Sequence, residues 1–483
     1  MTNEELNNLF EEQGKNRWAV AKTTAKERIA KILKLRKVIV ARQQEFYDAV
    51  WNDFHKPKTE AWMSEVFSAL QEIDHTVAHL DEWMEDRDGS WSPLFPTSQS
   101  VSHFEPMGRV LIMAPWNYPF LLFFAPVVAA VAAGNVVIAK PSHKTPHVAE
   151  VIESIVKEVF PPNEVAVVQG AGAEIGDKLL ALPFDHVFFT GSPNVGAHVA
   201  ESAAKVHAGV TLELGGKSPA IILDDVKIKD AAKKIAWGKC LNAGQTCIAP
   251  DYMLCPAKLV QPLAQEIAKN IAQMYGETED ARRHSENFVH IIESRTVKRH
   301  QALIQDAIAK GATAVIGAQF SPEDIENRYT PATILTGVTA DMHIMDSEIF
   351  GPILPIIAYE NIDEAIQFVQ ARPKPLALYI FGKAENKINE VIARTTSGSA
   401  CVNHCILQIA NNSVPFGGVG MSGTGNYHGI YGFKTVSHER NVMRQGAFDT
   451  MKFFYPPYHK ADEKSLRAKM QRLMKTVMKG IFS

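Results

Sequence analysis

A cysteine, a glutamate and an asparagine in this chain stand in settings that suit covalent chemistry on a carbonyl group. Cys247 ends the small, polar segment 242–247 (NAGQTC), where exposed amides could lower a thiol pKa of ~8.5 and make the sulfur a nucleophile. Glu213 lies between two leucines, so its carboxylate is either paired with a lysine, the commoner case, or held in a partly apolar pocket as a general base. Asn117 follows a predicted strand and could donate a hydrogen bond to an oxyanion. A buried structural thiol and a turn asparagine are the corresponding alternatives.

A glycine loop follows an apolar segment at 188–196 (FFTGSPNVG). Gly191 would let the backbone approach a pyrophosphate, and the helix expected behind it offers free amides and the positive end of its dipole. The spacing is GxxxxG, however, and differs from the GxGxxG of the dinucleotide fingerprint. Both a nucleotide site and a plain strand-to-helix turn therefore remain open.

Short apolar strands alternate with amphipathic helices around these residues. Strands are predicted at 110–114, 136–139, 165–168 and 186–190. Helices are predicted at 26–54, at 126–133 and from Thr145-Pro146 onward, where the threonine hydroxyl can cap the helix. A second series, from about 212 to 395, has apolar runs at 220–223, 332–335 and 377–381. This alternation predicts an α/β fold with parallel sheets covered on both faces.

One uncharged segment, 120–138, is nearly as long as the ~20 residues that cross a bilayer. Pro126 and the turn signal Gly134-Asn135 instead favour a buried helix, a turn and a strand. The N-terminal stretch 1–13 is polar and acidic, so no export signal is predicted.

The overall composition is that of an ordinary globular protein. The 483 residues are too many for one core, so two or three domains are expected. A net charge of −3 argues against nucleic acid as a partner. The five cysteines form no CxxC pair, which favours reduced thiols and a cytoplasmic location, and the seventeen histidines show no metal-site spacing such as HExxH, so no metal is predicted.

Seven motifs in order resemble those of the aldehyde dehydrogenase superfamily, over residues from about 20 to 455. They are PWNYP (115–119), AKPS (139–142), FFTGS (188–192), LELGGKSP (212–219), GQTC (244–247), EIFGP (348–352) and PFGGVG (415–420). The segments NAGQTCIAPDY (242–252), KPLALY (374–379) and YPPY (455–458) are similar to the class 3 branch, which includes fatty-aldehyde enzymes. The resemblance implies two Rossmann-like three-layer α/β domains and a small β bridging arm.

The resemblance also implies a role for each catalytic residue. Cys247 would attack the aldehyde to give a thiohemiacetal and then, after hydride transfer to the nicotinamide, a thioester. The Asn117 side chain and the Cys247 amide would hold the oxyanion, and Glu213 would activate the water that hydrolyses the thioester. Relatives that transfer the acyl group to coenzyme A generally lack a glutamate at this position, so release of a free acid is expected.

Cofactor and substrate contacts follow from the same resemblance. Glu348 would hold the nicotinamide ribose, with Phe350 beside the ring. Lys140 would bind the adenosine ribose, and the loop with Gly191, Ser192 and Gly196 would bind the pyrophosphate. The residues expected to line the aldehyde tunnel are Tyr118, Trp237 and Phe416. His428 also matches the class 3 pattern, but no chemistry is assigned to it.

One position departs from the family pattern. NAD-preferring relatives usually have a glutamate three residues after the lysine equivalent to Lys140, and this chain has His143 there. A carboxylate would repel the 2′-phosphate of NADP, whereas a histidine beside Lys144 would not. The sequence therefore predicts that NADP is accepted as well as NAD.

The expected domain order is a cofactor domain over 1–212, a catalytic domain over 213–397, a bridging arm over 398–450 that includes about 90–105, and a tail over 451–483. Within the tail, 463–483 has the pattern of a basic amphipathic helix, which could lie on an anionic membrane or pack on protein. The class 3 resemblance favours a homodimer. The alternatives are a coenzyme A-acylating enzyme and a non-catalytic or peripheral membrane protein on the same fold.

Overall fold

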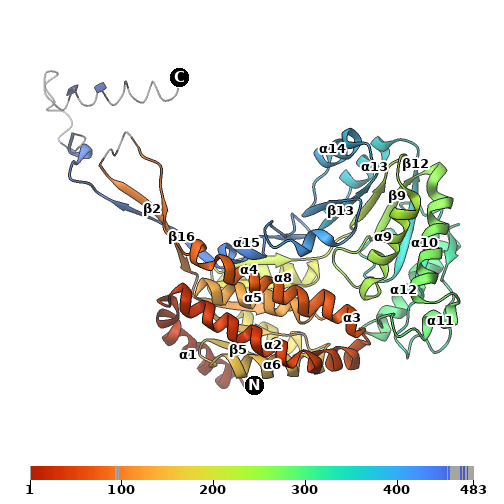
Figure 1. The fold of residues 1–483 in the computed structure, drawn as a ribbon, viewed down its shortest axis with the longest axis horizontal. Coiled ribbons are helices and arrows are strands. Elements are labelled where there is room, and N and C mark those ends of the chain that lie inside the picture. The colour runs from red at the N-terminus through yellow and green to blue at the C-terminus, as the bar shows by residue number, and fades with distance from the viewer. Residues whose placement is uncertain are drawn as a thin grey trace.

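Two α/β lobes and a projecting arm make up the protein in the computed structural model, which describes residues 2–92, 95, 97–453, 455, 456, 468, 469, 472, 473 and 476 (Figure 1). The amphipathic helix predicted over 463–483 lies almost entirely outside the described residues. Within the described ranges, no helix has both the length and the apolar character that a membrane-spanning helix needs.

The first lobe is built on a six-stranded sheet in the order β15-β7-β6-β3-β4-β5, parallel except at the edge strand β15. Its strands are β3 (Arg109–Met113), β4 (Val136–Lys140), β5 (Val165–Val167), β6 (His186–Thr190), β7 (Gly209–Glu213) and β15 (Gly423–Thr424). Along β3, Val110 and Ile112 enter one apolar core while Leu111 and Met113 enter another. Helices therefore cover both faces, and the predicted parallel α/β arrangement is confirmed.

The helices of this lobe mostly precede or connect these strands. They are α1 (Asn3–Ala21), α2 (Ala25–Phe54), α3 (Lys58–Ala61), the π-helical turn η1 (Trp62–Val66), α4 (Phe67–Trp83), α5 (Leu121–Ala133), α6 (Pro146–Val159), η2 (Gly172–Gly176), α7 (Asp177–Leu180) and α8 (Pro193–Lys205). Helix α2 begins with a capping box in which Thr24 and Glu27 satisfy each other's backbone amides.

The start of one helix differs from the sequence prediction. Helix α5 begins at Leu121 rather than at Pro126, because the Glu65 carboxylate accepts hydrogen bonds from the amides of Phe120 (2.8 Å) and Leu121 (3.4 Å). Every residue of α5 is buried, which offsets the hydrogen bond lost at Pro126.

Helix α6 begins where it was predicted, but Thr145 does not cap it. The Thr145 hydroxyl donates to the Ser142 carbonyl, and the cap comes from Asp53 in the last turn of α2. The two Asp53 carboxylate oxygens accept from the amides of His147 (3.3 Å) and Val148 (3.0 Å). A carboxylate also suits the positive end of the helix dipole.

The second lobe is built on a seven-stranded sheet in the order β10-β11-β12-β9-β8-β13-β14, parallel except at β10. Its strands are β8 (Pro219–Ile222), β9 (Tyr252–Pro256), β10 (Thr313–Ile316), β11 (Thr333–Thr336), β12 (Ile353–Tyr359), β13 (Ala377–Phe381) and β14 (Ser399–Val402). The α-helices are α9 (Ile228–Cys240), α10 (Val260–Tyr275), α11 (Glu279–Arg283), α12 (Ser294–Ala309), α13 (Ile362–Gln370) and α14 (Glu385–Arg394). Short 3₁₀ turns are η3 (Leu241–Gly244), η4 (Ala257–Leu259), η5 (His343–Met345) and η6 (Leu407–Ala410).

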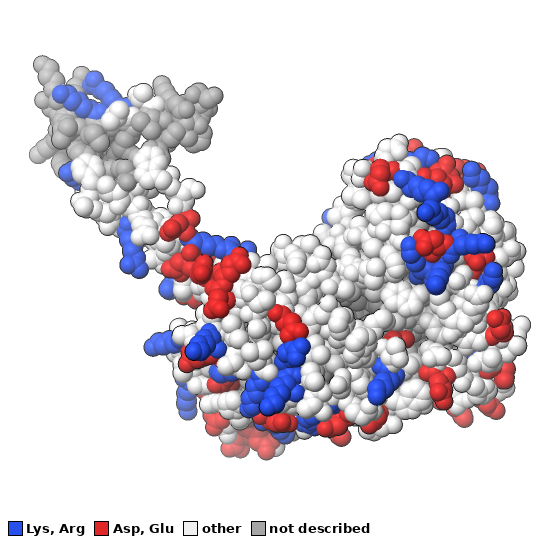
Figure 2. All heavy atoms as spheres, in the orientation of Figure 1, with Lys and Arg blue, Asp and Glu red and all other residues white. Residues whose placement is uncertain are grey.

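A three-stranded antiparallel sheet forms the arm and extends away from both lobes (Figure 1). It consists of β1 (Arg87–Asp88), β2 (Gln99–Pro106) and β16 (Ser437–Arg444), followed by η7 (Thr450–Phe453). Helix α15 (Gly429–Thr435) leads into β16 and packs on α4 and α5. Figure 2 shows charges of both signs interspersed over this face of the molecule, whereas the hollow between the two lobes carries few of them.

Candidate active site

The three predicted catalytic residues and the predicted cofactor contact Glu348 come from four chain segments that meet between the two lobes. Glu213 is the last residue of β7 and Asn117 follows β3, so both stand at the carboxyl end of the first sheet. Cys247 precedes β9 and Glu348 precedes β12, so both stand at the amino end of the second sheet. All four line one cleft. The site therefore lies where the carboxyl end of one sheet faces the amino end of the other.

The turn before Cys247 has an unusual backbone. Asn242, Ala243 and Gly244 have φ angles of 53°, 51° and 71°, three successive residues in the left-handed region. Gly244 is required, because an added Cβ would lie 2.3 Å from the Gly351 carbonyl oxygen. The Asn242 amide donates to the Glu60 carboxylate (2.8 Å), and the Asn242 side chain donates to the carbonyls of Asn117 (2.9 Å) and Gln245 (3.1 Å). These bonds fix the direction in which the chain enters Cys247.

Asn117 is buried and held from several sides. Its side-chain nitrogen donates to the Gln245 carbonyl (3.1 Å), and its own carbonyl accepts from Asn242 and from Lys56 Nζ (3.0 Å). An amide nitrogen carries two hydrogens, so the one used by Gln245 leaves a second for another acceptor. Asn117 is therefore oriented as a hydrogen-bond donor with one position to spare.

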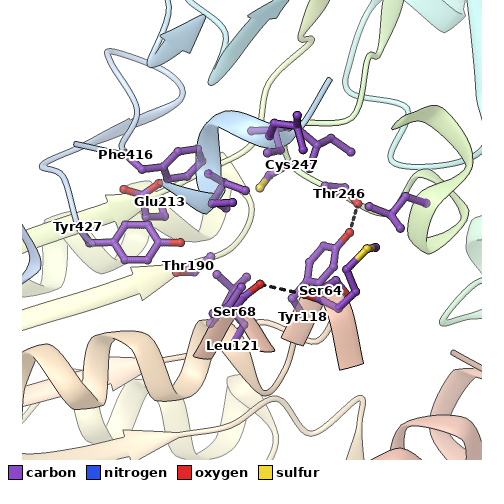
Figure 3. A pocket seen from close by; sticks show the side chains of 18 of the residues that line it. Ser64, Ser68, Tyr118, Leu121, Thr190, Glu213, Thr246, Cys247, Phe416 and Tyr427 are labelled. Atoms are coloured by element: carbon purple, nitrogen blue, oxygen red, sulfur yellow. Dashed lines mark hydrogen bonds between the residues drawn. The ribbon is translucent and has the colours of Figure 1, made fainter. Parts of the chain in front are cut away.

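An apolar cavity of about 140 Å³ opens beside Cys247 (Figure 3). The three residues predicted to line the aldehyde tunnel, Tyr118, Trp237 and Phe416, all line it, together with Glu213 and Cys247. The Tyr118 hydroxyl and Thr246 Oγ1 share a hydrogen bond of 2.6 Å, so the hydroxyl of this lining residue has a polar partner.

Several lining residues were not predicted. They belong to the helical region around η1, to α5, to η3, to η6 and to the loop after β15, and they include Met63, Ser64, Ser68, Leu121, Leu122, Leu241, Ile406, Leu407, Ile409 and Tyr427. In the sequence these residues look like ordinary helix or loop positions. Only the three-dimensional fold brings them to the cavity, and no local signal could have found them.

A second cleft, lined by two glycines and by both polar and apolar side chains, reaches the same cysteine. The predicted cofactor contacts Gly191, Ser192, Glu348 and Phe350 line it. The cleft also shares Thr190, Glu213 and Cys247 with the apolar cavity, so the two spaces meet at the sulfur.

Three predicted cofactor contacts do not line this cleft. Lys140 is buried at the end of β4, and among the described residues its ammonium donates only to the Pro141 carbonyl, at 3.4 Å. His143 is exposed in the following loop. Gly196 lies in α8 against Leu214, where an added Cβ would come within 2.6 Å of a leucine methyl carbon. Gly196 therefore serves the close packing of α8 on the sheet.

The titratable groups of the site are strongly affected by burial. Burial raises the pKa of the Glu213 carboxyl well above its usual value, and both of its oxygens lack a hydrogen-bond partner among the described residues. The lysine pairing considered for Glu213 is therefore wrong: the two leucines mark an apolar pocket. Burial, with Asp251 nearby, raises the pKa of Glu348 to about 8.

Cys247 is subject to opposing influences. Burial raises the pKa of its thiol to about 12, and the carboxylates of Glu348 and Glu213 act in the same direction. The backbone N–H groups of Cys247 and Ile248 act in the opposite direction, because they donate to the sulfur. A positive charge or a proton acceptor beside the sulfur is needed to make it a nucleophile.

The second cleft fits a nicotinamide dinucleotide. Gly191 follows β6, and Ser192 precedes α8 with a side chain that caps no amide, so the hydroxyl and the first-turn amides are available to an anion. The long hydrogen bond of Lys140 leaves donor capacity for a ribose hydroxyl. Within the described residues, no group of three or more His, Cys, Asp or Glu side chains could hold a metal ion.

Comparisons with known proteins agree with this geometry. The profile of the aldehyde dehydrogenase family matches residues 1–442. The chain is 38% identical to a probable coniferyl aldehyde dehydrogenase of Pseudomonas aeruginosa, over 95% of each chain. It is 40% identical to aldehyde dehydrogenase family 3 member A2 of Mus musculus, over 89% of this chain and 87% of that one. The solved substrate-bound state of Staphylococcus aureus AldH has a TM-score of 0.90 and 36% identity, over 98% of this chain and 99% of the other.

Proposed function

The chain belongs to the aldehyde dehydrogenase family, in its class 3 branch, and we propose that it oxidises apolar aldehydes to carboxylic acids with Cys247 as the nucleophile. It is an oxidoreductase that acts on aldehydes with NAD or NADP. The observation that carries the proposal is that Cys247 lines both the apolar cavity and the glycine-lined cleft. A substrate in one space and a cofactor in the other would meet at its sulfur.

The first step is attack of the Cys247 thiolate on the aldehyde carbon, which turns the carbonyl oxygen into an oxyanion. The free Nδ2 hydrogen of Asn117 and the Cys247 amide donate to this oxygen. When bound, the nicotinamide supplies the hydride acceptor. Glu213 takes a proton from the water that attacks the resulting thioester, and its raised pKa suits this role because a base must hold the proton it removes. The acid leaves and the thiol is restored.

The cofactor contacts are proposed on the same basis. Glu348 would hold the nicotinamide ribose and Phe350 the ring edge, since both line the cleft. The pyrophosphate would lie on Gly191, Ser192 and the start of α8, which Gly196 allows to pack closely on Leu214. Lys140 would reach the adenosine ribose, and His143 would admit NADP beside NAD.

The cavity favours an aromatic or aliphatic substrate. Its walls are almost entirely apolar carbon, and its volume of about 140 Å³ is close to that of a cavity that binds benzene. The coniferyl aldehyde named for the Pseudomonas aeruginosa relative is a substrate of this kind. A benzaldehyde-like ring or an alkyl chain would therefore enter, with its carbonyl at Cys247.

The test is NAD(P)H formation and acid production across a panel of aromatic and aliphatic aldehydes, without coenzyme A. We expect acid and reduced cofactor in equal amounts, and at least a hundredfold loss in Cys247→Ser. Cys401→Ser, at a half-buried thiol outside the site, is the matched control and should retain activity. Turnover retained in Cys247→Ser would refute the mechanism, and a requirement for coenzyme A would favour the acylating alternative.

The proposed assembly and domains follow the sequence-based division. The cofactor domain would span 1–212, the catalytic domain 213–397, the arm 398–450 with about 90–105, and the tail 451–483. The projecting sheet of β1, β2 and β16 supports a homodimer bridged by the arms. The five free cysteines support a cytoplasmic location. Light scattering of the purified protein should give twice the mass of the chain; a monomer would contradict this. The 463–483 segment would pack on protein, with peripheral membrane contact as the second candidate.

A further inference from the structure

Lys56 and Glu65 form an ion pair inside the first lobe. Both side chains are fully buried, and Lys56 Nζ lies 2.6 Å from Glu65 Oε1. Two charges removed from water regain only part of their hydration energy from each other. Apolar residues of similar size in place of a buried ion pair often make a protein equally stable. Stability alone therefore does not explain the pair. Both residues also make hydrogen bonds to the backbone near the site.

Lys56 holds Asn117 and its neighbour. Its ammonium donates to the Asn117 carbonyl (3.0 Å) and lies 4.2 Å from the centre of the Tyr118 ring. The Tyr118 hydroxyl in turn bonds to Thr246, the residue before Cys247. One buried cation thus contacts two residues that line the site.

Glu65 holds the other end of the same segment. Its second carboxylate oxygen accepts from the amides of Phe120 (2.8 Å) and Leu121 (3.4 Å), which begin α5. The segment 117–121 is therefore fixed at its start by the cation and at its end by the anion. Because the two charges are bonded to each other, neither end can shift without disturbing the other.

We propose that Lys56 and Glu65 are positioning residues for the oxyanion donor Asn117. The pair fixes the peptide from which the Asn117 side chain projects, so that one Nδ2 hydrogen meets the Gln245 carbonyl and the other faces the reacting carbonyl oxygen. Preorganised donors act only when they are aimed at the oxyanion, and an error of 1 Å can cost a hundredfold in rate. The inference rests on the role proposed above for Asn117.

A double-mutant cycle tests the inference. Lys56→Met combined with Glu65→Gln removes both charges, leaves neither one unpaired, and keeps an oxygen for the α5 amides. The measured quantity is kcat/KM for the aldehyde at saturating cofactor, in the parent and in Asn117→Ala. We expect a loss of at least tenfold in the parent and less than twofold in Asn117→Ala, where the donor to be positioned is already absent. If the role of the pair were purely structural, its removal would lower kcat/KM by the same factor in the parent and in Asn117→Ala.

Two further measurements keep the outcome decisive. Arg283→Met removes an ion pair with the buried Asp324 in the second lobe, and it should lower Tm while leaving kcat/KM within twofold. If the Lys56→Met/Glu65→Gln variant does not fold, Glu65→Gln alone is measured in the parent and in Asn117→Ala instead. Equal losses in both backgrounds, or a loss below twofold in the parent, overturn the inference. If Asn117→Ala itself retains kcat/KM, the proposed oxyanion role fails; if only the pair variants retain it, the positioning role alone fails.

Discussion

Replacing Glu213 with glutamine should leave an enzyme that oxidises one aldehyde per site and then slows sharply. Both carboxyl oxygens of Glu213 are buried without a hydrogen-bond partner among the described residues, and burial raises the pKa of this group. Glutamine has nearly the same shape, so the cavity and the steps before thioester hydrolysis should survive. What is lost is the acceptor for the proton of the attacking water.

The size of the effect follows from general-base catalysis. A positioned base contributes about 10²–10⁴ in rate, which corresponds to roughly 3–5 kcal/mol of barrier height. We therefore expect a burst of about one NAD(P)H per site, followed by turnover at least ~100-fold slower than in the parent. Only the ionised carboxyl acts as a base, so the raised pKa makes hydrolysis in the parent increase with pH, and this increase should disappear in Glu213→Gln.

The same substitution should change stability in a pH-dependent way. The folded pKa of Glu213 lies above the unfolded value, so the folded chain holds its proton longer and Glu213 costs stability as pH rises from the unfolded pKa toward the folded one. Glutamine carries no such charge. The Tm of Glu213→Gln relative to the parent should therefore improve with increasing pH.

Stopped-flow absorbance of NAD(P)H, together with quantification of the acid, measures the burst and the steady state. Glu348→Gln is the matched control, because Glu348 is also a carboxyl lining the cleft, and its burial raises its pKa to about 8. This control should slow cofactor reduction and show no burst. A steady-state rate in Glu213→Gln within threefold of the parent, with no burst, would refute the assignment of the base.

Three other predictions concern the cofactor, acid stability and the tail. The parent should show kcat/KM for NAD over NADP below ~10³, and His143→Glu should shift this ratio at least tenfold toward NAD by repelling the 2′-phosphate; an unchanged ratio would contradict it. Burial lowers the pKa of His300 to about 3, so the folded protein forgoes a proton that the unfolded chain binds below pH ~6.5. His300→Gln removes this penalty. In denaturant titrations, the amount by which the variant is less stable than the parent should therefore shrink by about 1.4 kcal/mol per pH unit as the pH falls from 6 to 4. A difference that stays constant with pH would contradict this prediction. Full-length and Δ463–483 protein should co-sediment equally little with anionic vesicles; binding by the full-length chain alone would assign the tail to the membrane.

The strands could be predicted from the sequence because buried parallel strands are continuous apolar runs. Those at 110–114, 136–139 and 186–190 agree with β3, β4 and β6 to within one residue. The start of α5 could not be predicted, because the carboxylate that caps it belongs to Glu65, 55 residues earlier. Pro126 favours a helix start at that position, but the contact with Glu65 starts the helix five residues earlier and leaves the proline inside it.

The same division between local and distant information applies to the site. Residue type and spacing left a structural alternative open for Cys247, Glu213 and Asn117, and the ordered set of family motifs singled these three residues out as candidates. The structure brings all three to one cleft. Lys56 lies in the short connection between α2 and α3, and Ser64 lies in η1; only packing brings them to the site. For Glu213 the local pattern allowed two environments, and the absence of a cation within reach in the described structure decided between them.

Strand β15 has a consequence for how the protein is made. It supplies the edge of the first sheet by pairing with Leu212 and Glu213, although it lies about 210 residues further along the chain. A ribosome adding about 5–20 residues per second needs about 10–40 s to cover that distance. During this interval the nascent first lobe carries an unpaired strand edge that ends at Glu213, the proposed general base. Completion of the first lobe therefore has to wait until the residues of the second lobe and of β15 itself have been synthesised.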